Sequence, residues 1–230
     1  MEIEIHHRPA YAMAEVTLGP GETVVAESGA MVSMDTSVQI ETSAGKKGQG
    51  LLGGLAAGLK RVVGGESFFQ NRFTANTSGG RVSFAPTLVG DIASVDLRNS
   101  TVILQSTAFL CSGEDVAVQA KWGGARSFFG GEGFIMLRAS GTGPLVFNSF
   151  GGIKEIDVAG EFVVDTGHIV AFDDSLNFNI RKFGGGWRSF IFGGEGLVCH
   201  FSGRGRLWIQ TRNPIEFGKT IGPKLPMREH

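Results

Sequence analysis

A glycine pair followed by glutamate occurs three times in this 230-residue chain. Each copy precedes a run of apolar residues, and a glycine pair in that place is typical of a hairpin turn. We therefore expect the three glutamates to be structural, with each carboxylate accepting hydrogen bonds from turn amides. The copies are GGESFF at 64–69, GGEGFI at 130–135 and GGEGLV at 193–198, with Glu66, Glu132 and Glu195 as their acidic residues.

A second pattern precedes each glycine pair. A segment of alternating apolar and polar residues, typical of a half-buried strand, leads into a block with Ser or Thr at its centre and apolar residues on both sides. The segments are 14–18, 93–97 and 154–158, and the blocks are VVAESGAMVSM at 24–34, VILQSTAFLCS at 102–112 and FVVDTGHIVAF at 162–172. The sequence thus predicts three repeated units, at about 12–90, 91–151 and 152–217.

Units of this length contain several short strands each and exceed the usual solenoid period. Together with 36 glycines and 18 phenylalanines, they favour an all-β fold, a β-sandwich or β-prism with tight turns. We expect one globular unit over 1–217. The remainder, 218–230, has two prolines and no periodicity, and we expect a flexible tail there.

The first unit is longer than the others because of an apolar insertion at 45–63. Its leucines and valines recur at spacings of three, four and seven, which predicts one apolar face of a short helix. The run is too short to cross a bilayer, and basic residues flank it. We interpret it as a candidate interaction element that packs on its own assembly, a membrane surface or a protein partner; its residues are Lys46, Lys47, Leu51, Leu52, Leu55, Leu59, Lys60, Arg61, Val62 and Val63.

The sequence offers no catalytic, cofactor-binding or metal-binding motif. It has no His-x-His pair, no Gly-x-Ser-x-Gly and no complete phosphate-binding loop. The formal net charge of −1 argues against nucleic acid, although arginines and aromatic residues interleave at 121–129 and 181–192. We expect Cys111 and Cys199 to be buried thiols. No secretory signal is visible, so we expect a cytoplasmic protein, with a membrane-peripheral location as the alternative.

Several of these segments together resemble a known family. They are ESGAMVSM at 27–34, the insertion with its flanks at 50–69, LVGDIASVDL at 88–97 and STAFLCSGEDV at 106–116. The chain is similar, over about 1–217, to the bacterial family related to altered inheritance of mitochondria protein 24. The resemblance implies an all-β fold similar to the trp RNA-binding attenuation protein, assembled as a homotrimer. It implies neither RNA binding nor any catalytic residue.

Three functional hypotheses follow. The first is a non-enzymatic oligomeric β-protein that acts as a scaffold or interaction module. The second is a β-sandwich that binds a small ligand or catalyses a reaction in a pocket. The third is nucleic-acid binding. The sequence names no partner other than a second copy of the chain.

Overall fold

The computed structural model describes residues 1–43, 70–121, 135–182 and 197–226. Almost all regular structure in these ranges is antiparallel strand, which confirms the predicted all-β class. The strands expected at 14–18, 93–97 and 154–158 are all present, within β2, β8 and β12. The predicted helical insertion at 45–63 lies outside the described residues.

Residues 1–43 and 70–84 supply seven strands in two sheets. Strand β2 pairs with β7, and β3 pairs with β6, so the second pair is nested inside the first in the sequence. The strands are β1 (Glu2–His6), β2 (Met13–Leu18), β3 (Thr23–Glu27), β4 (Met31–Met34), β5 (Val38–Ser43), β6 (Gln70–Ala75) and β7 (Gly80–Phe84).

The following residues form the same order of elements twice: a long strand, a 3₁₀ turn, two short strands and a second long strand. The long strands pair with each other in both cases. The elements are β8 (Ile92–Gln105), η1 (Ser106–Ala108), β9 (Phe109–Gly113), β10 (Val116–Lys121) and β11 (Met136–Asn148), then β12 (Ile153–Asp165), η3 (Thr166–His168), β13 (Ile169–Asp173), β14 (Asn177–Lys182) and β15 (Leu197–Gln210). The order of pairings recurs; the division of the sequence into three repeats stays a prediction.

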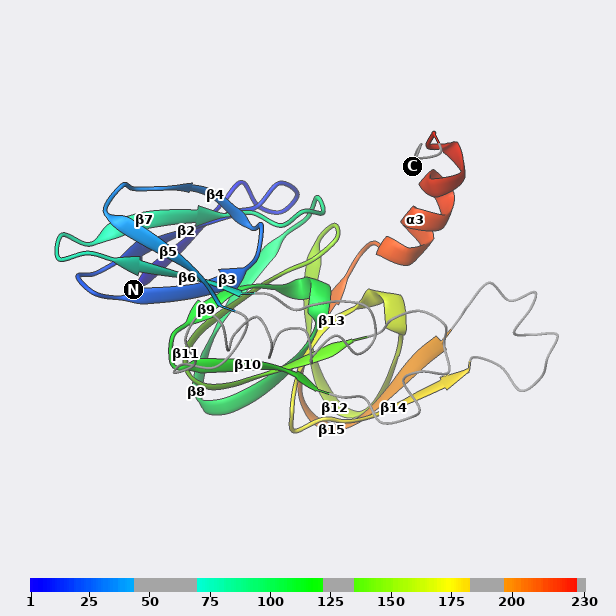
Figure 1. The fold of residues 1–230 in the computed structure, drawn as a ribbon. Helices are drawn as coiled ribbons and strands as arrows, with labels where there is room; N and C mark the ends of the chain where they lie inside the picture. The colour runs from blue at the N-terminus through cyan, green and yellow to red at the C-terminus, as the bar shows by residue number, and fades with distance from the viewer. Residues whose placement is uncertain (44–69, 122–134, 183–196, 227–230) are drawn as a thin grey trace.

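The described strands form two sheets (Figure 1). The smaller has the order β1-β2-β7-β4. The larger has the order β12-β15-β13-β8-β11-β9-β3-β6-β5, with β10 and β14 paired to β11 and β15. The pairs β3–β9 and β8–β13 connect successive parts of the chain within this sheet. Strands β12 and β4 each end a sheet.

Alternation within the strands divides the apolar side chains among three core clusters. In β6 every second residue is buried, as a strand with one core-facing side requires. An edge-to-face aromatic pair lies within each cluster, an arrangement that adds to the free energy of area burial. The pairs are Phe73 with Phe84, Phe147 with Trp208, and Phe172 with Phe201.

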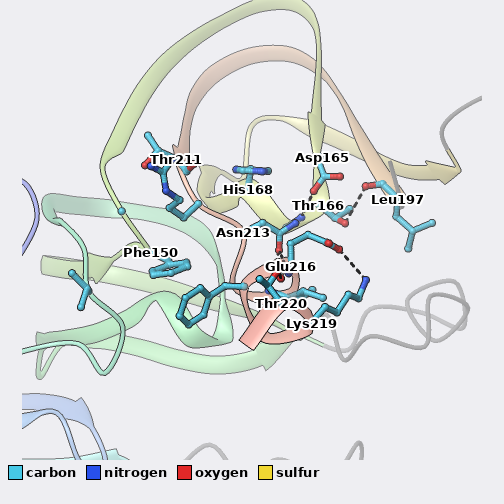
Figure 2. Close-up of a pocket in the computed structure, with 16 residues that line it drawn as sticks. Phe150, Asp165, Thr166, His168, Leu197, Thr211, Asn213, Glu216, Lys219 and Thr220 are labelled. Atoms are coloured by element: carbon cyan, nitrogen blue, oxygen red, sulfur yellow. Dashed lines mark hydrogen bonds and ion pairs between the residues drawn. The ribbon is translucent and has the colours of Figure 1, made fainter. Parts of the chain in front are cut away.

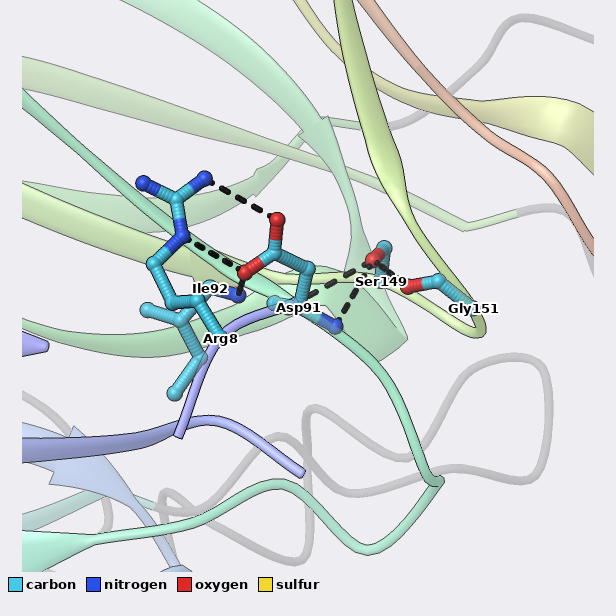
Figure 3. Close-up of polar contacts among 5 residues, drawn as sticks. All are labelled: Arg8, Asp91, Ile92, Ser149 and Gly151. Atoms are coloured by element: carbon cyan, nitrogen blue, oxygen red, sulfur yellow. Dashed lines mark hydrogen bonds and ion pairs between the residues drawn. The ribbon is translucent and has the colours of Figure 1, made fainter. Parts of the chain in front are cut away.

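An ion pair fixes the N-terminal segment to the start of β8 (Figure 3). Arg8 Nε donates to Asp91 Oδ1 at 2.8 Å, and Nη2 donates to Oδ2 at 2.9 Å. The Asp91 side chain is only 3% exposed and also accepts from the Ile92 amide. The Ser149 hydroxyl, which donates to the Gly151 carbonyl, holds the next turn against Asp91. A Cβ at neighbouring Gly90 would overlap the Ser149 carbonyl, so the close approach requires glycine.

The C-terminal segment contains helix α3 (Pro214–Ile221) and the 3₁₀ turn η4 (Gly222–Lys224). The boundary predicted at 217 therefore falls inside a helix, and the first residues of the expected tail are helical. The sequence signal was present: the Asn213 side chain accepts from the Ile215 and Glu216 amides, and Pro214 occupies the first helical position. Figure 1 shows α3 standing off the sheets.

The Arg8–Asp91 pair yields a stability prediction. Replacing Arg8 with Met leaves the enclosed Asp91 carboxylate without its guanidinium partner, and we expect a loss of about 2 kcal/mol in the free energy of unfolding. Arg138→Met is the matched control, because both arginine side chains are 51% exposed but its partner Asp174 is 37% exposed. We expect that variant to change by less than about 0.5 kcal/mol. Chemical denaturation measures both, and equal losses would contradict the account.

Candidate functional site

An open hollow of about 760 Å³ lies where η3, the end of β15 and α3 meet (Figure 2). The backbone turn Asp165–His168 forms one wall, and residues 211–213 with the first turns of α3 form the other. Phe150 lies at its base, and its ring packs edge-to-face on Phe217 of α3 with centroids 5.1 Å apart. This aromatic contact holds the helix over the hollow.

Several polar side chains that line the hollow form hydrogen bonds to backbone groups of the protein. His168 Nδ1 donates to the Gln210 carbonyl at 2.8 Å, and Gln210 in turn bonds the Gly167 carbonyl and the Phe150 amide. Asp165 accepts from the Gly167 amide, and the Thr166 hydroxyl donates to the Leu197 carbonyl. These bonds position backbone, which is the role that polar groups have at a structural turn.

Two charged groups on α3 complete the lining. Glu216 Oε1 and Lys219 Nζ form an exposed ion pair at 2.9 Å on the helix surface. The hollow thus has room for a small molecule. Among the residues that the structure describes, no group of three or more His, Cys, Asp or Glu side chains is placed to hold a metal ion.

A second candidate site consists of β4 and β12, each of which lies at one end of a sheet. All four residues of β4 are exposed, although three of them are the large apolar residues Met31, Val32 and Met34. Residues 159–163 of β12 are also exposed and include Phe162 and Val163. Strand edges with exposed apolar side chains are templates for pairing with another chain.

Glu27 lies at the end of β3, beside the pairing of β3 with β9. Burial raises the pKa of its carboxyl to about 7, because the enclosed site disfavours the charged form. A carboxylate in this position lowers stability near neutral pH, and nothing in the sequence pattern predicted it.

The sequence-predicted site residues have two outcomes. The interaction element at 46–63 and the turn glutamates Glu66, Glu132 and Glu195 lie outside the described residues, so both interpretations stay predictions. The expectation of buried thiols is confirmed, because Cys111 and Cys199 are free and enclosed. Burial raises the pKa of both thiols, that of Cys199 to about 12. Neither is a thiolate near neutral pH, so neither has the form that acts as a nucleophile.

The apolar residues of β4 and β12 were missed as a site. Their apolar character was visible, since Val32 matches Leu110 in the block at 102–112 and Val163 matches Ile103 there. Alternation alone could not show that these copies are exposed while the copy at 102–112 is buried. The difference depends on which strand lies beside each block.

The fold and these edges define an all-β protein built of antiparallel sheets with open ends. Comparison with known proteins gives the family. The mitochondrial biogenesis AIM24 family model matches residues 3–212, and the chain belongs to this family. An uncharacterized protein of Streptococcus pyogenes serotype M6 is 31% identical over 98% of this chain and 92% of its own length.

A solved structure shares the fold. The crystal structure of another Streptococcus pyogenes protein superposes with a TM-score of 0.80, at 27% identity, over 97% of this chain and 99% of that one. The resemblance drawn from the sequence segments is confirmed.

The raised pKa of Glu27 predicts a pH-dependent stability. Between about pH 4.5 and pH 7 the unfolded carboxyl ionises while the folded one holds its proton, so stability falls as pH rises through this window. Glu27→Gln removes this loss. Because the side chain is only partly enclosed, we expect a gain of about 1 kcal/mol at pH 8 and little change at pH 4.

Glu22→Gln is the control with the opposite sign. Hydrogen bonds from the Met1 ammonium and the Gly19 amide lower the pKa of Glu22, so its stabilising effect is present above the unfolded pKa and lost in acid. Thermal unfolding at the two pH values measures both variants. A Glu27→Gln melting temperature that does not rise at pH 8 would show that the carboxyl is not held in its neutral form.

Proposed function

We propose that this chain is a non-enzymatic β-protein that assembles with copies of itself and acts as a scaffold or interaction module. One observation carries the proposal: β4 and β12 expose large apolar side chains along edges that pair with no other strand in the part of the chain that the structure describes. Soluble chains protect such edges, and an unprotected one marks an interaction surface. The hollow beside α3 gives weaker support for a non-enzymatic function: its polar side chains form hydrogen bonds to the backbone.

The proposed assembly is a homotrimer with cyclic symmetry. Light scattering coupled to size-exclusion chromatography should give about three times the 24.4 kDa mass of one chain. A single-chain mass at micromolar concentration would overturn the proposal of an oligomeric module. A stable dimer or larger ring would overturn only the copy number.

The second candidate function is small-ligand binding in the hollow of about 760 Å³. A metabolite thermal-shift screen distinguishes the two. A ligand that stabilises the wild type but not the variant Phe217→Ala, which removes the ring over Phe150, would favour the binding function. Stabilisation of neither protein by any compound leaves the scaffold proposal as the better one.

A peripheral contact is proposed for the insertion, on the strength of its sequence. Replacing 46–63 with a Gly-Ser linker of equal length should leave the β-type circular dichroism spectrum unchanged and abolish binding to vesicles that contain anionic lipid. In a control, Lys46, Lys47, Lys60 and Arg61 become Gln while the leucines stay, which separates the charge contribution of about 1 kcal/mol per residue from apolar burial. Vesicle binding that survives the replacement contradicts this contact. No helix in the described ranges is both long and apolar enough to cross a membrane.

A further inference from the structure

Two antiparallel pairings join successive parts of the chain, and both have the same register. In each pairing, three residues that precede the central Ser or Thr of one block pair with three residues that follow the central residue of the next block. In the first, β3 meets β9 with Val24↔Gly113, Val25↔Ser112 and Ala26↔Cys111. In the second, β8 meets β13 with Val102↔Asp173, Ile103↔Phe172 and Leu104↔Ala171. We call this arrangement the joint.

The register of the joint is fixed relative to Ser28, Ser106 and Thr166, the central residues of the three blocks. A residue two positions before the central residue pairs with one five positions after the central residue of the next block. Applying the same offsets to the last block and the first predicts a third joint. Its pairs are Phe162↔Asp35, Val163↔Met34 and Val164↔Ser33.

Both strands of this third joint are present, and the edge that each would use has no strand partner among the described residues. Strand β12 pairs with β15 along one edge and ends the larger sheet. Strand β4 pairs with β7 along one edge and ends the smaller sheet. Strand β4 also has the bulge that β9 and β13 have: Val32, Leu110 and Val170 are each skipped in the pairing with the neighbouring strand. The block strand β4 is therefore already shaped like the two strands that do form joints.

Exposure separates the third joint from the other two. At the bulge, Leu110 and Val170 are 0% and 1% exposed, whereas Val32 is 55% exposed. On the opposite strand, Val25 and Ile103 are 7% and 0% exposed, whereas Val163 is 47% exposed. Equivalent positions thus carry apolar side chains in all three cases, and these side chains are exposed only at the third joint, where the two strands do not pair.

We propose that β12 of one copy pairs with β4 of a second copy in the register of the joint. The inference rests on the proposed assembly and names its contact. The occupant is a second copy because each chain supplies one complementary half at each end. Strand pairing needs backbones about 4.7–4.9 Å apart, and β4 and β12 of one chain end different sheets on opposite sides of the molecule in Figure 1. The contact is head-to-tail, so repeating it closes a ring or extends a filament.

Two single variants test the contact. Val163→Glu places a charge on the β12 half, and Val32→Glu places one on the β4 half; both side chains are exposed in the single chain, so each fold should persist. We expect each variant alone to have the mass of one 24.4 kDa chain by light scattering. Mixing them leaves one intact half on each, and the mixture should form a 1:1 dimer and nothing larger. Ile40→Glu, at an exposed position on the edge strand β5, should keep the wild-type mass.

The outcomes separate this inference from the proposed function. If both variants keep the wild-type mass, the copies meet elsewhere, so the joint is wrong while the oligomeric module stands. If each is a single chain but the mixture forms no dimer, the contact is not head-to-tail and the inference is overturned. A wild type with the mass of one chain overturns both proposals.

Cysteine pairs test the register even where a charged variant fails to fold. Met34→Cys with Val163→Cys in one chain should give disulfide-linked species of two or more chains with oxidised glutathione. Met34→Cys with Val164→Cys is the matched control, because adjacent strand residues face opposite sides and the second pair should not link. Linking within a single chain, or equal linking in both variants, would contradict the inference.

Discussion

Backbone hydrogen bonding along strand edges is the constraint on which this structure depends. A strand inside a sheet bonds on both sides, and an end strand leaves one row of N–H and C=O groups without a strand partner. The chain meets this requirement internally with the β3–β9 and β8–β13 joints, each of which buries apolar residues of both strands. The core clusters, the bulges at Leu110 and Val170 and the clamp between Arg8 and Asp91 all support strands held in that order.

The same constraint gives the chain two unlike ends. One end presents β4 and the other presents β12, and each has exposed apolar residues that no strand of the described ranges covers. The proposed function requires no reactive group, because the proposed assembly is a contact between these two edges. The hollow at α3 differs from these edges, because its polar side chains form the hydrogen bonds that hold the turn at η3 and cap the helix.

Much of the fold could be predicted from the sequence. Alternation in segments such as 14–18 and 154–158 located strands β2 and β12, and the matching blocks indicated that equivalent strands recur. The helix cap at Asn213 is equally visible in the sequence, but the segment after it lacks the apolar periodicity that predicts a helix. Alternation could not predict which apolar residues are exposed. Leu110 and Val32 occupy equivalent positions in the sequence, and they differ in whether another strand lies alongside. Long-range contacts such as Arg8 with Asp91 join residues 83 positions apart and have no local signal.

Hydrogen–deuterium exchange on the wild-type protein tests the central claim most directly. The amides of 33–35 and 162–164 that point away from β7 and β15 have no strand partner among the described residues of one chain, so they should exchange within the fastest phase when the protein is dilute. At concentrations where it assembles, the account predicts that both segments become protected together, to the degree measured in the same experiment at 24–26 and 102–104, whose pairings lie within the chain. Fast exchange at both segments in the assembled protein would contradict it.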